Sequence, residues 1–274
     1  MTSARARDHL LVLATSAAAS WASHRVARQL PRRARAPWER TNHAGHTVTL
    51  LEGPAFVAGA LTAAALGVGA GRGNRAAAAA VAAAAAGALG ALDDLAGGAA
   101  DKGLRGHLAA LRRGQVTTGA VKVVGLAATG LAVAALTDRN RRGPLSTILG
   151  GAVVAGAANA VNLFDLRPGR ALKVTVMTGL PLVTGTPGAA AVGSSLGVIG
   201  DDLAARSMLG DTGANAAGAL VGLAVVERTG LVGRAVALAG LSALTLASER
   251  VSFTRVIEGN RMLRHLDEWG REPR

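Results

Sequence analysis

Six aspartates stand at the ends of long apolar stretches of this sequence: Asp93, Asp94, Asp165, Asp201, Asp202 and Asp211. An ionisable group at such a position is costly to bury, and groups of this kind tend to be functional. Carboxylates that converge from separate loops suit a hard cation such as Mg²⁺, which binds one or two carboxylates together with substrate phosphates. The pattern therefore predicts a site for magnesium and a phosphate-bearing substrate.

Two asparagines precede one of these acids in the pattern N-x-x-N-x-x-D, formed by Asn159, Asn162 and Asp165. On a helix, residues three apart share a face. An amide on that face can orient a carboxylate or contact a phosphate oxygen. A hydrogen bond between two helices is an equally good interpretation of the spacing.

The composition indicates a membrane protein. Half of the 274 residues are apolar and only 17% are charged, where about 25% is ordinary for a soluble domain. The absence of cysteine excludes disulfides and thiolate metal sites. The net charge of +13 does not predict nucleic-acid binding, because the cations lie between apolar blocks and only 2% of the residues are aromatic.

The uncharged stretches predict an all-α, polytopic transmembrane helix bundle, since a spanning helix needs about 20 mostly apolar residues. The candidate stretches are residues 10–23, 54–71, 76–92, 118–137, 143–164, 174–200, 213–226 and 229–248. The stretch 174–200 is too long for one span, and turn-forming residues at 184–188 divide it into two short helices. About nine spans follow.

The distribution of basic residues predicts the orientation. With nine spans, 21 of the 30 Lys and Arg residues fall on one side, which the positive-inside rule assigns to the cytoplasm. The six aspartates fall on that side too, so the predicted active site is on the cytoplasmic face. A signal peptide at the N-terminus is the alternative for the first stretch, but six arginines follow it directly. The abundance of Ala, Gly and Arg suggests a bacterial protein of the plasma membrane, crossing it several times.

The only three lysines, Lys102, Lys122 and Lys173, are also predicted to be cytoplasmic. An ammonium group binds phosphate as a point charge, so these lysines are candidates for holding a phosphate-bearing substrate. The alternative is that they are solvated cations at helix ends.

Four segments together resemble the successive cytoplasmic motifs of glycosyltransferase family four: L-D-D at 92–94, D-K-G-L at 101–104, N-A-V-N-L-F-D at 159–165 and M-L-G-D-T-G-A-N at 208–215. This family comprises the polyprenyl-phosphate sugar-1-phosphate transferases, among them phospho-N-acetylmuramoyl-pentapeptide transferase and the undecaprenyl-phosphate N-acetylglucosamine-1-phosphate transferases. The resemblance implies transfer of a sugar-1-phosphate from a UDP-sugar to a polyprenyl (undecaprenyl or decaprenyl) phosphate. It further implies dependence on Mg²⁺, release of UMP, and a role in cell-wall, including peptidoglycan, or surface-glycan biosynthesis.

The resemblance also implies roles for individual residues. The implied catalytic acids are Asp93, Asp94 and Asp165, and the implied metal ligand is Asp211. The implied substrate-binding residues are Lys102, Lys122, Asn159 and Asn162. A fainter match places Asn42, His43, Gly45 and His46 in the first cytoplasmic loop of the family.

Two departures from the family pattern keep an alternative open. Asp165 is followed by Leu166, Arg167 and Pro168 in place of a glycine-rich D-G-x-D-G, and His265 is the only histidine of the tail where the family carries a histidine-rich segment. The alternative is a catalytically degenerate relative that binds polyprenyl phosphate or a cell-wall partner. A transporter is disfavoured, because transporter sites lie near the bilayer midplane.

The chain is predicted to have two parts, a membrane domain at 1–248 and a cytoplasmic tail at 249–274. The tail mixes apolar residues with arginines and acids, which is typical of an amphipathic helix on a membrane surface. Covering the site, docking a partner and simple anchoring are all compatible with this pattern. The sequence also leaves a homodimer open.

Overall fold

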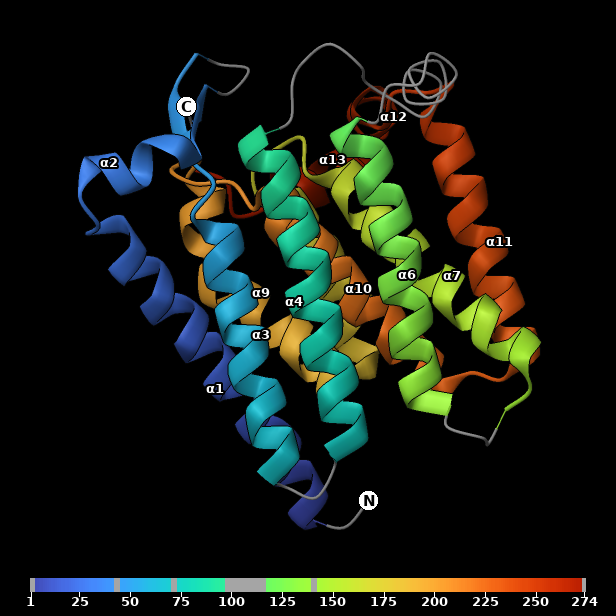
Figure 1. Ribbon diagram of the computed structural model, residues 1–274. Helices are drawn as coiled ribbons and strands as arrows, with labels where there is room; N and C mark the ends of the chain where they lie inside the picture. The colour runs from blue at the N-terminus through green and yellow to red at the C-terminus, as the bar shows by residue number, and fades with distance from the viewer. Residues whose placement is uncertain (1–2, 42–44, 70–72, 97–116, 139–141, 273–274) are drawn as a thin grey trace.

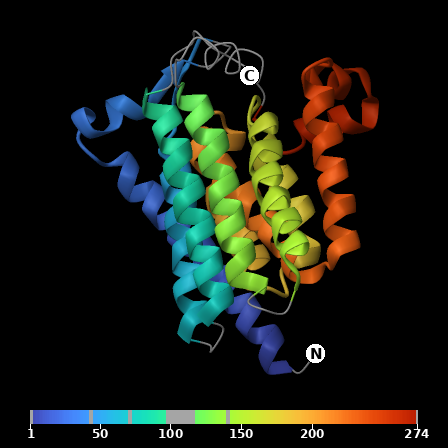
Figure 2. The same cartoon turned by 45° about the vertical axis from the view of Figure 1, so that its right-hand side comes forward.

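The computed structural model describes residues 3–41, 45–69, 73–96, 117–138 and 142–272, which form a bundle of long helices packed side by side (Figures 1 and 2). The first half contains α1 (Ser3–Arg28), α2 (Arg32–Arg35), η1 (Ala36–Trp38), β1 (Glu39–Thr41), β2 (Thr47–Thr49), α3 (Glu52–Gly69), α4 (Gly73–Ala96) and α6 (Thr118–Asp138). The second half contains α7 (Pro144–Phe164), α8 (Arg170–Gly179), η2 (Leu180–Leu182), α9 (Thr186–Leu203), α10 (Gly210–Arg228), α11 (Leu231–Ser248), α12 (Phe253–Gly259) and α13 (Arg261–Glu268).

The all-α prediction is confirmed, with one small exception that the sequence did not predict. The strands β1 and β2 pair antiparallel as a short ribbon, with Arg40 opposite Val48. The ribbon is tied to the bundle where the Met208 N–H donates to the Thr49 carbonyl, at 2.9 Å. The ribbon therefore lies beside the segment that leads into α10.

Four helices in the described part of the chain are long and apolar enough to cross a membrane: α4, α6, α7 and α11. This supports a membrane protein in outline, while the total of nine spans stays a prediction. The helix α11 differs from the other three because it lies at the edge of the bundle, where it packs against α7 and leaves most of its surface exposed (Figure 1).

The centre of the bundle is α10, whose residues are almost all buried between α4, α7, α3 and α9. Small residues allow these backbones to approach closely. At Gly218 on α10, an added Cβ would collide with the backbone of Ala157 and Ala158 on α7. The Ala-rich α4 likewise buries Ala79, Ala83 and other alanines completely, so its low complexity reflects helix packing.

The long apolar stretch at 174–200 is broken, as the sequence predicted. The chain leaves η2 at Leu182, turns, and begins α9 at Thr186 with Pro187 in the first turn. Because α8 and α9 run in opposite directions, the C-terminal ends of α7 and α9 and the N-terminal ends of α6 and α10 meet at one end of the bundle. This end, at the top of Figure 1, is called the acidic end below.

Candidate active site

Lys122 bridges two of the predicted acids at the acidic end. Its Nζ donates to Asp93 Oδ2 at 3.0 Å and to Asp211 Oδ2 at a still closer distance. Asp93 lies on the last turns of α4, Lys122 on the first turns of α6, and Asp211 on the first turn of α10. The Lys122 side chain is 14% exposed and the two carboxylates are each 23% exposed, so water and a small ligand can reach them.

Asp93 is also held by a second donor. The Thr118 hydroxyl, at the start of α6, donates to Asp93 Oδ1 at 2.8 Å. The two contacts fix the carboxylate of Asp93 against α6, so the end of α4 and the start of α6 are joined through polar side chains.

Asp94 turns away from Lys122 and binds the N-terminus of α10. Its carboxylate accepts the backbone N–H of Asp211 at 3.0 Å, the N–H of Thr212 at 2.9 Å and the Thr212 hydroxyl at 2.6 Å. The first N–H groups of a helix lack partners within the helix, and its dipole favours an anion there. Gly210 precedes this turn with a φ of +65°, which glycine adopts without strain. Asp94 therefore positions Asp211.

Asp165 lies directly after α7 and faces the same region from another side. Burial raises the pKa of Asp165 well above its usual range, and the negative charges of Asp202 and Asp211 raise it further, while the Gly210 N–H opposes them. A carboxyl group in this environment is disposed to hold a proton, unlike the lysine-paired Asp93.

A second group of acids lies beneath this cluster: Asp202, one of the six aspartates singled out in the sequence, and Glu52, which was not assigned a role from the sequence. Glu52, the first residue of α3, accepts a close hydrogen bond from the Ser207 hydroxyl, and Asp202 accepts the Gly169 N–H at 2.9 Å. Both side chains are fully buried, and burial raises the pKa of each. They anchor the loops before α8 and α10. The sequence pattern that identified the other acids could also have identified Glu52, because it too stands at the end of an apolar stretch.

Five other predicted residues are placed elsewhere or stay untested. The Asn159 amide donates to the Thr245 hydroxyl on α11 at 3.2 Å, which is a contact between helices and not a contact with the acids. The Asn162 carbonyl accepts the Asp165 N–H at 3.1 Å and so helps to end α7. Lys102 lies outside the described residues, as do Asn42 and His43.

Three charged residues at this end have partners that the sequence did not reveal. The guanidinium of Arg40, on the ribbon, donates to the Asp94 carbonyl and brings a positive charge next to the site. Asp201 pairs instead with Arg28 at 2.9 Å and with Arg206 at 2.8 Å, so it ties α1 to the end of α9. Lys173 donates to the carbonyls of the C-terminal tail.

The donor set fits a hard cation that is shared with a phosphate. Among the residues that the structure describes, no group of three His, Cys, Asp or Glu side chains is arranged to hold a metal ion alone. The ammonium group of Lys122 nevertheless lies between two carboxylates, which is the place that a cation would occupy. Because Mg²⁺ commonly takes only one or two carboxylates and completes its shell with phosphate and water, Asp211 and Asp93 fit this role.

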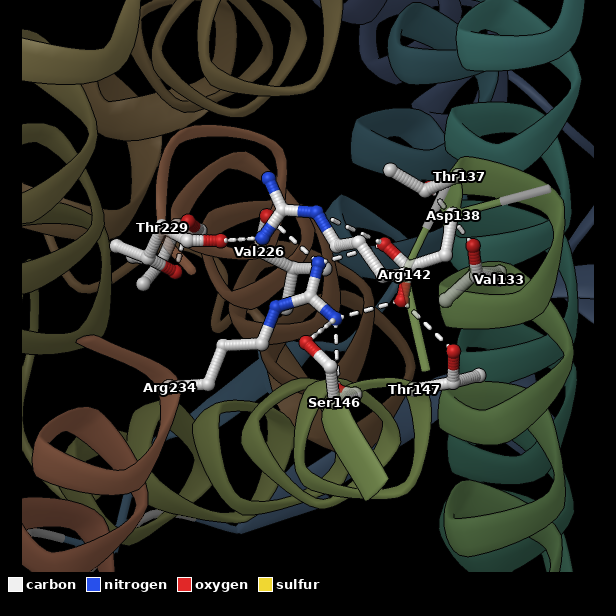
Figure 3. A network of polar contacts seen from close by, with 10 residues as sticks. Val133, Thr137, Asp138, Arg142, Ser146, Thr147, Val226, Thr229 and Arg234 are labelled. Carbon is white, nitrogen blue, oxygen red and sulfur yellow. Dashed lines mark hydrogen bonds and ion pairs between the residues drawn. The ribbon is translucent and has the colours of Figure 1, made fainter. Parts of the chain in front are cut away.

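The opposite end of the bundle holds a different polar cluster (Figure 3). Arg234, buried on α11, donates to both oxygens of Asp138 on α6, at 2.6 and 2.7 Å. It also donates to the carbonyls of Ser146 and Val226, at 2.7 and 2.9 Å. The Thr147 hydroxyl donates to Asp138 at 2.8 Å. Every charge here has close partners, which is typical of a structural ion pair.

No protein-family model matches the sequence, and no curated protein is significantly similar to it.

Proposed function

We propose that this protein transfers a sugar-1-phosphate from a UDP-sugar to a polyprenyl phosphate, with Mg²⁺, and releases UMP. The observation that carries the proposal is the convergence of Asp93, Lys122 and Asp211, with Asp94 and Asp165 beside them, at the ends of four different helices. The four aspartates come from three of the segments whose motifs resemble glycosyltransferase family four, and Lys122 lies outside them.

The proposal includes a topology. The bundle would cross a bacterial plasma membrane about nine times, with the acidic end in the cytoplasm, where UDP-sugars are made. The candidate spans α4, α6 and α7 all have an end at the acidic cluster, which supports a site at the membrane surface. A polyprenyl phosphate would then reach the site laterally, with its chain along the apolar helices and its phosphate at the level of Lys122.

The proposed reaction is a phosphoryl transfer. An oxygen of the lipid phosphate forms a bond to the sugar-bearing phosphorus of the UDP-sugar, and the bond from that phosphorus to the bridging oxygen breaks. UMP leaves with the electron pair. Both reactants are anions, so neutralisation of charge is the main requirement. Lys122 meets it by donating to a phosphate oxygen, in exchange for one of its present carboxylate partners.

The acids have separate roles in this proposal. Asp211 and Asp93 would hold Mg²⁺ together with the diphosphate, and the ion would neutralise charge on the reacting phosphates. Asp94 keeps Asp211 in place through the N-terminus of α10. Asp165, whose pKa is raised by burial, is suited to exchange a proton with the lipid phosphate.

The test is UMP release by the purified full-length protein in detergent. The mixture contains undecaprenyl phosphate, Mg²⁺ and one of a panel of UDP-sugars. Release with one sugar, lost in Asp211→Asn and on chelation of Mg²⁺, is the expected result. Asp201→Asn is the matched control, because this aspartate lies at the same end but pairs with Arg28 and Arg206. Equal release by Asp211→Asn would overturn the metal assignment.

Two observations favour a second candidate, a catalytically degenerate relative that binds polyprenyl phosphate. Lys122 is already paired with two carboxylates, and the tail lacks a histidine-rich segment. Undecaprenyl phosphate would then raise the thermal stability of the protein, and Lys122→Ala would abolish that effect, but no sugar of the panel would cause UMP release.

A further inference from the structure

The C-terminal tail is attached to the bundle through three acidic side chains, of which Asp267 alone is buried. Asp267, 9% exposed, accepts from Nε and Nη2 of Arg170 at 2.7 and 3.0 Å. Glu258 pairs with Arg167 at 3.4 Å. Glu272 pairs in the same way with an arginine of the bundle, Arg206, at 3.5 Å. The attachment of α12 and α13 is therefore largely ionic.

Further contacts hold the tail against the end of α7 and the start of α8. Phe253 stacks on Phe164 with ring centroids 5.3 Å apart, and Lys173 donates to the Leu266 and Asp267 carbonyls at 3.2 and 2.6 Å. The tail is therefore packed as part of the fold, and this packing determines which of its side chains face outward.

The outward face of α13 carries large apolar side chains together with charged ones, whereas its carboxylate Asp267 faces the bundle. All of its residues are exposed except Asp267. Met262 is 69% exposed, Leu266 41%, and Trp269, directly after the helix, 72%. Large apolar side chains that are exposed together with charged ones are typical of a surface that contacts a membrane or a partner.

Arginines accompany these apolar side chains. Arg250, Arg255, Arg261 and Arg264 are exposed, and within the described residues none of them belongs to an ion pair. The exposed acids on the same segment that are not paired with the bundle are Glu249 and Glu268. The other acids of the tail are paired with Arg167, Arg170 and Arg206. The outward face therefore carries an excess of positive charge.

We infer that this outward face of α12 and α13 binds anionic lipid headgroups at the membrane surface. The chain leaves α11, a helix able to cross a membrane, at Ser248 and begins α12 at Phe253, so the tail starts at the level where that helix would leave the bilayer. Figure 2 shows α12 and α13, in the darkest red, at this same end of α11. Tryptophan prefers the membrane interface, and arginine is attracted to anionic headgroups.

The experiment uses the full-length protein with Trp269 as its single tryptophan, obtained with Trp21→Phe and Trp38→Phe. The protein is placed, one copy per particle, in nanodiscs of phosphatidylcholine or of phosphatidylcholine mixed with phosphatidylglycerol. Quenching of Trp269 by brominated acyl chains reports contact with lipid, and quenching by iodide reports contact with water. We expect stronger bromine quenching and weaker iodide quenching in the mixed discs.

Variants separate the charged from the apolar contribution. Arg261→Gln and Arg264→Gln should each weaken the preference for the anionic lipid by roughly fivefold. Met262→Gln should reduce bromine quenching in both lipids. A single-Trp38 protein is the reference for the same end of the bundle. Each variant keeps the ion pair between Asp267 and Arg170, so its thermal transition should match that of the unsubstituted protein. This match is checked first.

The inference does not depend on the proposed transferase activity, because the readout is the position of Trp269. Free access of iodide to Trp269 in both lipids would overturn it. Protection from iodide without bromine quenching would show that protein covers the face, and would also overturn it. Equal bromine quenching in the two lipids would overturn the assignment to anionic headgroups.

Discussion

Two ends of α6 carry charged side chains, and they are satisfied in different ways. At the acidic end, Lys122 is shared between Asp93 and Asp211, and all three side chains are partly exposed. At the other end, Asp138 and Arg234 are buried and meet in a bidentate pair.

The difference lies in the balance of donors and acceptors. Both Nη groups of Arg234 are fully used, because together they donate to two carboxylate oxygens of Asp138 and to two backbone carbonyls, while its buried Nε has no partner among the described residues. At the acidic end, Asp93 and Asp211 share the ammonium group of Lys122, which imposes no planar geometry on its partners. An excess of acids near water suits a site that exchanges partners, whereas a saturated pair suits a fixed joint between α6, α7 and α11.

The largest effect should come from breaking the saturated pair. Arg234→Met leaves the carboxylate of Asp138 buried without its main partner and should lower the free energy of unfolding by about 3–5 kcal/mol. Denaturant titration of the protein in detergent measures this. The double variant Arg234→Met with Asp138→Leu should recover most of the loss. If Arg234→Met loses less than about 1 kcal/mol of the free energy of unfolding, the two ends of α6 do not differ in this way.

Lys122→Met should have a smaller effect on stability, below about 2 kcal/mol, because Asp93 and Asp211 remain in contact with water. The two carboxylates, now without the ammonium group, should bind Mg²⁺ more readily. Added Mg²⁺ should therefore raise the melting temperature of Lys122→Met more than that of the wild type. Arg234→Met serves as the comparison and should gain nothing, since its acid lies in a closed joint. An absence of any Mg²⁺ effect on Lys122→Met would contradict a cation site at the acidic end.

Asp94→Ala should cost about 1 kcal/mol, typical of a lost helix cap, because the carboxylate binds the first N–H groups of α10. Asp94→Asn keeps an acceptor and should cost less. Hydrogen exchange at the start of α10 measures the local effect. Faster exchange at the far end of α10, near Val226, would show that the loss is not local.

The sequence was sufficient for the broad architecture and for the acids. Apolar stretches indicated the helices, and the turn residues at 184–188 located the break before α9. The acids converged because they stand at helix ends that meet at one end of the bundle. The ribbon was missed because three-residue strands carry too little pattern to be recognised. The pairing of Arg234 with Asp138 was missed because spacing along a helix reveals only neighbours three or four residues apart.

Two assignments within the site required the tertiary structure. Asn159 shares a helix face with Asn162 in the pattern, but only the packing of α11 shows that its partner is Thr245. Asp93 and Asp94 are adjacent residues of the same type, so the sequence does not distinguish their partners. Successive residues on a helix point about 100° apart, so one carboxylate meets Lys122 while the other meets α10.

The smallest expected effect concerns Lys173, which holds the tail at the acidic end. Burial, reinforced by the charge of Arg271, lowers the pKa of Lys173 to about 8. The unfolded chain keeps the ordinary pKa of about 10.4, so between these values the unfolded state binds more protons than the folded state. Stability should therefore rise slightly as the pH increases from about 8 to about 10.4, and Lys173→Met should abolish the rise. Thermal unfolding in detergent at several pH values measures it. Because Arg234 lies at the other end of the bundle, Arg234→Met should leave the slope unchanged, and an equal loss of slope in that variant would show that the pH dependence does not arise at the tail.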